Sequence, residues 1–172
     1  MKKGIFIPPE GGEGTGKRTQ ITLLQQALLA AGVDAITTRE PGGTDQAERI
    51  RAVLVQKDSG VFDPLTEALL LFAARREHLV HKIWPAMERG QWVISDRFAD
   101  STRAFQGYGM GLDMQVIEDL YQIAAGDFQP HLTFIFDMDP EVGLRRAMKL
   151  LQTIQTNEGR YEQMGLAFHQ RL

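Results

Sequence analysis

A glycine-rich run near the start of the sequence carries the clearest chemical pattern. It reads Gly11, Gly12, Glu13, Gly14, Thr15, Gly16, Lys17 and matches G-x-x-x-x-G-K. Glycines let the backbone curl so that successive N–H groups point at one phosphate, and the lysine adds a mobile charge for the β- and γ-phosphates. The pattern predicts a binding site for nucleotide phosphates. The competing interpretation is a glycine-rich turn with a surface lysine.

The position after the lysine departs from the full pattern, which has a Ser or Thr there to bind Mg²⁺. Arg18 occupies that position and Thr19 follows it. Arginine carries a fixed positive charge and cannot bind a cation. Either other oxygens hold the metal, with Glu13 and Asp96 acting through water as the candidates, or activity is weakened.

Three further polar clusters each follow a short apolar run that suits a buried strand. They are Arg39–Thr44, Asp96–Gln106 and Asp137–Asp139. Arg97 is notable because an arginine directly after a buried strand, beside an aspartate, suits an anion-binding role. The four histidines (His78, His81, His131 and His169) show no metal-binding spacing and are interpreted as structural or surface residues.

Strands alternating with helices must position these clusters. The patterns predict strands at 5–7, 33–38, 92–95 and 132–136, and helices at 17–31, 44–56, 64–89, 113–126, from 140 onward and 161–172. Such alternation is typical of an α/β fold with a parallel sheet covered by helices on both faces. Ligands bind beyond the carboxyl ends of the strands in these sheets. Because every polar cluster falls at such an end, we expect one shared site.

Two segments do not fit this scheme easily. Pro8 and Pro9 close the first strand, although proline removes hydrogen-bond donors from a ladder. Residues 149–160 are polar and weakly periodic, which indicates a mobile loop.

Composition limits the class of protein. The 172 residues suit a single domain, and the net charge of −3 argues against nucleic-acid or anionic-membrane binding driven by overall charge. The longest apolar run, Ala68–Ala74, is far shorter than the ~20 residues of a membrane span. The sequence has no cysteine, which excludes disulfides and thiolate chemistry and favours a cytoplasmic location.

Four segments make residues 4 to about 171 resemble the bacterial thymidylate kinase family of P-loop nucleoside monophosphate kinases. The first is the loop from Glu10 to Lys17, and the second is Thr38–Thr44, which resembles T-R-E-P-G-G-T. The third is Phe72–Arg76, which resembles F-x-A-x-R. The fourth pairs Asp96-Arg97-Phe98 with Ala104–Gly107, which resemble D-R-Y/F and A-Y-Q-G.

The resemblance implies a three-layer P-loop kinase domain over residues 1–172 that transfers the γ-phosphoryl group of ATP to thymidine monophosphate. It implies ATP-binding residues Gly11, Gly12, Glu13, Gly14, Thr15, Gly16, Lys17, Arg18 and Thr19. It implies acceptor-binding residues Glu40, Pro41, Phe72, Arg76, Arg97, Thr102 and Gln106, with Phe72 stacked on the thymine ring. Arg146 and Arg160 would belong to a lid at about 146–160. Catalysis would depend on Lys17, Arg97 and Arg160, with Asp96 near Mg²⁺.

The family also implies a homodimer and a last strand and helix beyond Leu172, so the sequence leaves the adenine pocket unassigned. Two alternative functions stay open at this point. One is a small kinase of the same fold with another nucleotide acceptor. The other is a nucleotide-binding module with impaired catalysis, which Arg18 would explain.

Overall fold

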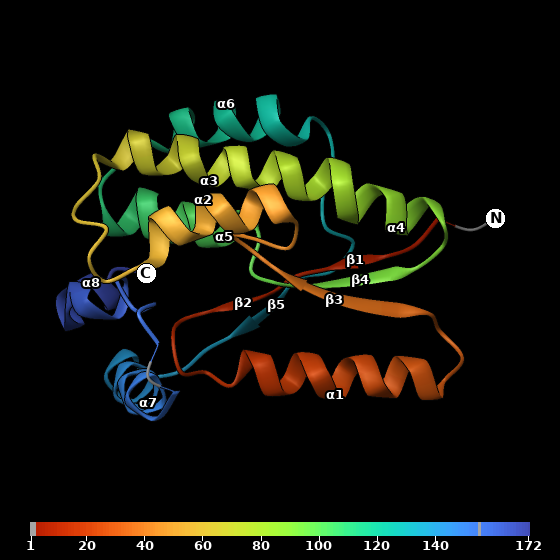
Figure 1. Ribbon diagram of the computed structural model, residues 1–172, viewed down its shortest axis with the longest axis horizontal. Coiled ribbons are helices and arrows are strands. Elements are labelled where there is room, and N and C mark those ends of the chain that lie inside the picture. Colours follow the sequence, from red (N-terminus) through yellow and green to blue (C-terminus); the bar gives the residue numbers. More distant parts are fainter. Residues whose placement is uncertain (1–2, 155) are drawn as a thin grey trace.

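The computed structural model describes residues 3–154 and 156–172 and places parallel strands between layers of helices (Figure 1). The strands are β1 (Phe6–Ile7), β2 (Pro9–Gly11), β3 (Ala35–Arg39), β4 (Trp92–Asp96) and β5 (Phe134–Phe136). β4 lies between β1 and β3, and β2 pairs with β5. Every pair is parallel. The predicted α/β class with a parallel sheet is therefore confirmed.

The two prolines lie where the chain changes partner. β1 pairs with β4, and β2 pairs with β5 after only one intervening residue, Pro8. The Pro8 carbonyl accepts from the Phe134 N–H at 3.2 Å, and the Pro9 carbonyl accepts from the Arg97 N–H at 3.1 Å. Prolines supply acceptors even though they lack donors. The prolines therefore still connect this segment to both of its neighbours.

The helices begin close to their predicted caps. Asp63, Thr44 and Asp113 each accept backbone N–H hydrogen bonds at the starts of α3, α2 and α6. The α-helices are α1 (Lys17–Ala30), α2 (Asp45–Val55), α3 (Pro64–His78), α4 (Trp84–Glu88), α5 (Ala99–Thr102), α6 (Met114–Ala125), α7 (Pro140–Ile154) and α8 (Leu166–His169). Two π-helical segments, η1 (Leu79–Ile83) and η2 (Arg103–Gly109), and one 3₁₀ turn, η3 (Glu162–Met164), complete the described elements.

Several boundaries differ from the sequence predictions. The expected helix at 64–89 contains the π-helical segment η1. α7 continues to Ile154, so the prediction of a loop from 149 onward is wrong for its first half; residue 155 lies outside the described part of the chain. The expected helix at 161–172 is broken at Gly165, whose φ of 82° is not helical. The segment formed by α5 and η2 was not predicted.

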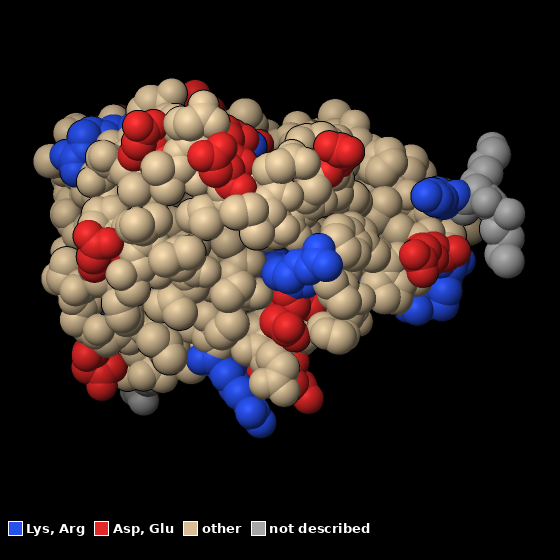
Figure 2. Space-filling view, turned by 90° about the horizontal axis from the view of Figure 1, so that it is seen from above, with Lys and Arg blue, Asp and Glu red and all other residues tan. Residues whose placement is uncertain are grey.

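The layers place the site at one end of the sheet. α1 covers one face, and α2, α3 and α6 lie on the other (Figure 1). The main core fills the second side and includes Phe6, Phe98 and Ile117, each at most 1% exposed. Charges of both signs are scattered over the face that α6 presents (Figure 2). Within the described residues, no helix combines the length and apolar character that crossing a membrane requires.

Candidate active site

The glycine-rich loop joins β2 to α1, as predicted. At two positions the fold leaves no space for a side chain. A Cβ on Gly11 would lie 2.3 Å from the Phe136 carbonyl oxygen, and one on Gly14 would lie 2.0 Å from the Gly143 carbonyl oxygen. Both glycines also have positive φ, at 132° and 67°. The close approach of β5 and α7 therefore explains why these positions are glycine.

Lys17 is folded back into this loop. Its Nζ donates to the Gly11 and Gly12 carbonyl oxygens at 2.8 and 2.7 Å, and the residue is only 6% exposed. Burial, followed by the nearby positive charge of Arg97, lowers the pKa of Lys17 to about 8. The loop thus holds a partly desolvated ammonium group at the start of α1, which is the arrangement expected for phosphate binding.

Arg97 reaches the same loop from the end of β4. It donates to the Gly11 carbonyl oxygen at 3.0 Å and to Ser101 Oγ at 2.9 Å, and it pairs with Glu13 at 2.5 Å. Burial alone would raise the pKa of Glu13, but the charges of Arg97 and Lys17 outweigh it and hold that pKa low. Glu13 thus places an anion between two cations. The left-handed φ of Arg97, 72°, marks a strained backbone of the kind found at functional sites.

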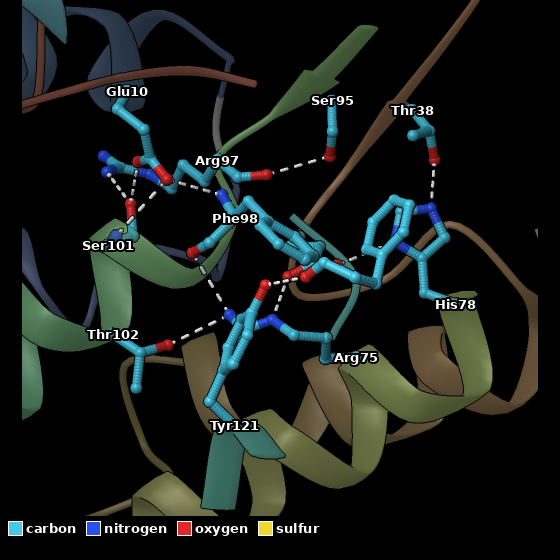
Figure 3. Close-up of polar contacts among 12 residues, drawn as sticks. Glu10, Thr38, Arg75, His78, Ser95, Arg97, Phe98, Ser101, Thr102 and Tyr121 are labelled. Carbon is cyan, nitrogen blue, oxygen red and sulfur yellow. Dashed lines mark hydrogen bonds and ion pairs between the residues drawn. The ribbon is translucent and has the colours of Figure 1, made fainter. Parts of the chain in front are cut away.

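Glu10 holds the residues next to Arg97 and was not predicted as a site residue. It is 3% exposed and accepts from the Phe98 N–H at 2.7 Å and from Ser101 Oγ at 2.6 Å (Figure 3). Burial raises its pKa, despite the hydrogen bond from Ser101. The side chain therefore fixes the turn between β4 and α5 that presents Arg97.

A second buried arginine, Arg75, lies on α3. Its Nε donates to Glu40 at 2.8 Å, and its Nη2 donates to Thr102 Oγ1 and the Phe98 carbonyl oxygen at 3.0 and 3.1 Å (Figure 3). Its Nη1 is buried and has no hydrogen-bond partner among the described residues. The hydrogen bonds to Nε and Nη2 hold the guanidinium group in place, and Nη1 is left as a donor.

Glu40 is the centre of this network. It also meets His78 Nδ1 at 3.1 Å, and His78 Nε2 lies 2.6 Å from Thr38 Oγ1. Burial opposes ionisation of Glu40, but Arg75 and His78 prevail and lower its pKa. The next residue, Pro41, follows a cis peptide bond and accepts from Arg51 through its carbonyl oxygen. Glu40 therefore organises the site as a partner of Arg75.

The structure does not bring Arg76 to the site, contrary to expectation. Arg76 is exposed, donates to the Ala124 carbonyl oxygen at 3.1 Å and stacks over Trp84. Phe72 is a core residue, 4% exposed, with the Arg75 guanidinium 4.7 Å from its ring centre. Arg75 lies on the buried side of α3 together with Leu71, Ala74 and His78, whereas Arg76 lies on its exposed side.

Gln106 and Arg160 meet on a buried glutamate, Glu67. Gln106 Nε2 donates to Glu67 Oε1 at 2.7 Å, and Arg160 donates to Glu67 Oε2. Arg160 also donates to the Leu54 carbonyl oxygen at 2.6 Å and is 8% exposed. In this conformation Arg160 is therefore packed against Glu67 and Leu54, and its expected role in catalysis stays a prediction. Glu67 itself was missed by the sequence analysis.

α7 packs directly against the loop. A Cβ on Gly143 would lie 2.4 Å from the Glu13 carbonyl oxygen, and Arg146 Cβ lies close to Gly14. A cavity of about 30 Å³ remains between the two segments. A small-molecule pocket typically measures about 300–1,000 Å³. Arg146 therefore lies on the helix that covers the Gly14 side of the loop.

Candidate metal ligands are few. Asp96 Oδ1 is buried without a hydrogen-bond partner among the described residues, at the end of β4. Arg18 and Thr19 are exposed on the first turn of α1. No cluster of three or more His, Asp or Glu side chains within 3–154 and 156–172 could hold a metal by itself. Mg²⁺ needs only one or two carboxylates when phosphates and water supply the rest.

Comparisons with known proteins agree with this geometry. The sequence model of the thymidylate kinase family matches residues 10–171. The chain is 47% identical over 170 residues to a thymidylate kinase of Citrifermentans bemidjiense, covering 98% of this chain and 76% of that protein. It is 48% identical over 172 residues to one of Caulobacter vibrioides, covering 100% and 80%.

A crystal structure of thymidylate kinase from Ehrlichia chaffeensis superposes with a TM-score of 0.74 at 40% identity, covering 88% of this chain and 82% of that one. The family match spans nearly the whole sequence, and the solved structure shares the fold. The chain therefore belongs to the thymidylate kinase family.

Proposed function

We propose that this chain transfers the γ-phosphoryl group of ATP to thymidine monophosphate (dTMP), giving dTDP and ADP in dTTP synthesis. The observation that carries the proposal is that the half-buried Arg97 contacts the Lys17 loop, while the buried Arg75 binds the carbonyl oxygen of the next residue, Phe98, in a member of this family. Phosphoryl transfer needs phosphates held in line and charge neutralised, with little covalent chemistry. The acceptor phosphate oxygen is already anionic, so no general base is required.

The donor phosphates belong with the loop from Gly11 to Thr19. Its backbone N–H groups and the start of α1 favour an anion, and Lys17 supplies the full charge. Arg97 is proposed to hold the acceptor phosphate. Without nucleotide, Lys17 donates to loop carbonyl oxygens and Arg97 pairs with Glu13. A bound phosphate would replace these contacts with stronger hydrogen bonds between charged groups.

Recognition of the base is assigned to Arg75 and Gln106. Arg75 is proposed to take the role expected for Arg76, because its Nη1 is a buried donor without a hydrogen-bond partner among the described residues and could donate to a carbonyl oxygen of the base. Glu40 and Thr102 hold its other donors, and Pro41 fixes Arg51 beside them. Thymine and uracil offer ring carbonyl groups, and adenine offers none.

We assign the lid to 146–160, as part of the single domain spanning 1–172. Arg146 on α7 is its candidate contact with phosphate, since α7 already covers the loop. Arg160 anchors the end of the lid through Glu67. We propose that α7 moves relative to the loop when ATP binds, because the space between them is small.

Mg²⁺ is proposed to be held by Asp96, with Glu13 contributing through water once Arg97 turns to phosphate. The buried unpartnered Asp96 oxygen fits this role. The ion would neutralise charge on the transferring phosphoryl group.

We expect Asp96→Asn to raise the Mg²⁺ concentration for half-maximal rate several-fold, because an amide oxygen is a weaker ligand than a carboxylate. The measurement is a Mg²⁺ titration of the initial rate at fixed ATP. Asp100→Asn, an exposed neighbour, is the matched control. An unchanged Mg²⁺ dependence in Asp96→Asn would remove Asp96 from the metal site.

The lowered pKa of Lys17 predicts that kcat/KM for ATP falls at alkaline pH. Its ammonium binds phosphate only when protonated, and its pKa is lowered to about 8 in the free protein. We therefore expect kcat/KM for ATP, which reports the free enzyme, to fall as pH rises through about 8. Lys17→Arg should move that fall to higher pH, because arginine stays protonated. A profile flat to pH 10 in the parent protein would contradict this environment for Lys17.

Two broader assignments accompany the function. A homodimer would cover the exposed apolar side chains Leu65 and Leu69 on α3 and Ile123 on α6. A reducing cytoplasm suits a sequence without cysteine.

An acceptor panel tests the proposed function. Coupled ADP release should favour dTMP over AMP, GMP and CMP by roughly a few hundredfold or more in kcat/KM, because the wrong base leaves buried polar groups unpaired. AMP or CMP matching dTMP would indicate a different small-nucleotide kinase. ATP binding without turnover on any acceptor would indicate a nucleotide-binding module.

A further inference from the structure

Glu67 is a fully buried carboxylate whose three side-chain partners all donate to it. Tyr161 donates to Oε1 at 2.8 Å, Gln106 Nε2 donates to the same oxygen at 2.7 Å, and Arg160 donates to Oε2. An ionised carboxylate accepts hydrogen bonds and cannot donate one. Glu67 therefore accepts only one orientation of the Gln106 amide, with the NH₂ group toward itself.

The other end of that amide has no partner. Gln106 Oε1 is buried and receives no hydrogen bond from any described residue. Buried acceptors normally have a donor, so an orphaned one calls for a group that the protein does not supply. Gln106 lies on η2 directly after Phe105, whose ring the Arg97 guanidinium covers. η2 itself begins directly after Thr102, whose hydroxyl accepts from Arg75. The orphaned oxygen therefore belongs to the element that borders both arginines.

We propose that Glu67 is a specificity-determining positioning residue, which fixes Gln106 as an acceptor and thereby selects an acceptor base with a ring N–H. This inference rests on the proposed function of the same site. A free amide could turn over and read either a donor or an acceptor. With its NH₂ held by Glu67, Gln106 offers only Oε1. Thymine has an N–H at N3, and cytosine has a bare acceptor nitrogen there, so the fixed amide rejects cytosine.

The test compares dTMP with dCMP in the parent protein, Glu67→Gln and Tyr161→Phe. A glutamine at 67 both donates and accepts, so the Gln106 amide is no longer held in one orientation. We expect the dTMP-to-dCMP ratio of kcat/KM to fall by roughly tenfold or more in Glu67→Gln. The loss should appear mainly as a higher KM for dTMP. Tyr161→Phe removes a different hydrogen bond from the same Glu67 oxygen and should keep the ratio within about twofold.

A double-mutant cycle separates positioning from general disruption. If Glu67 acts through Gln106, the double variant Glu67→Gln/Gln106→Ala should discriminate no worse than Gln106→Ala alone. A further loss in the double variant, or an unchanged ratio in Glu67→Gln, would overturn the proposal. A parent protein that does not phosphorylate dTMP at all would instead overturn the proposed function.

A measurement on the parent protein keeps the proposal testable if Glu67→Gln does not fold. A dTMP analogue methylated at N3 lacks the donor that Gln106 Oε1 requires, and its methyl group meets the fixed oxygen. We expect its dissociation constant, measured by calorimetry, to exceed that of dTMP by roughly tenfold or more. Equal binding of the two nucleotides would show that Gln106 Oε1 does not read the ring N–H.

Discussion

Lys17→Ala is expected to lower kcat at least about 10²-fold while the protein stays folded. Lys17 is the only ammonium group among the described residues that donates to the glycine loop, and its Nζ lies 2.7–2.8 Å from two loop carbonyl oxygens. Removing one preorganised group that stabilises transition-state charge typically costs about 10²–10³ in rate. The measurement is steady-state ADP release at saturating dTMP, with circular dichroism to verify the fold.

Lys82→Ala is the matched control for this experiment. Lys82 lies on η1, outside the glycine loop and outside the segment 146–160 that is assigned as the lid. Its removal should leave kcat near the parent value. A folded Lys17→Ala protein with parental kcat would exclude Lys17 from phosphoryl transfer.

Arg75→Lys is expected to lower kcat/KM for dTMP by roughly 10- to 100-fold, whereas Arg76→Lys stays near the parent value. Arg75 uses Nε and Nη2 for three protein contacts and keeps Nη1 available. The lysine of the variant has a single ammonium group instead of a planar guanidinium group. It cannot make these three contacts and also donate a hydrogen bond to a base. Lysine retains the charge that Glu40 needs, so the buried pair is not broken outright.

Arg76→Lys is the matched control for Arg75→Lys, because the two variants change adjacent arginines in the same way. Arg75 and Arg76 are adjacent on α3, but one is 2% exposed and the other lies on the outer surface against Trp84. Kinetics with dTMP and melting curves should be recorded for both. If Arg76→Lys lost more kcat/KM than Arg75→Lys, the original expectation for Arg76 would be restored and the base site would lie elsewhere.

Much of the fold follows from local signals. Asp63-Pro64, Thr44 and Asp113 cap helices in the structure as their residue types predict. The interruption of the 64–89 helix was not foreseeable, because η1 contains no glycine and proline comes only at Pro85 in α4. The last turns of α7, up to Ile154, were also missed. A loop was predicted from residue 149 because the apolar residues there did not recur clearly at helical spacing.

The proposed phosphate-binding half of the site was predictable from the sequence because its main part is contiguous. The loop from Gly11 to Lys17 has its own pattern, and Arg97 closely follows a buried strand. The proposed base-binding half depends on long-range contacts. Glu67 meets Arg160, 93 positions away, and Gln106, 39 positions away, and no local pattern reports such a pairing.

Arg75 and Arg76 could not be separated from the sequence. Arg75 lies three residues after Phe72 and Arg76 lies four residues after it, so helical spacing brings both near the face of Phe72. The structure buries Arg75 and leaves Arg76 exposed. Which of the two arginines binds the base stays a prediction.

Product identification tests the central claim most directly. The purified chain would be incubated with ATP, Mg²⁺ and dTMP, and ³¹P NMR would follow every phosphate resonance. We predict equal amounts of ADP and dTDP, with neither formed when dTMP is omitted and with both formed at least about 10²-fold more slowly in Lys17→Ala. ADP formed with inorganic phosphate and no dTDP, or no consumption of ATP in the folded parent protein, would contradict the assignment of this chain as a dTMP-phosphorylating kinase.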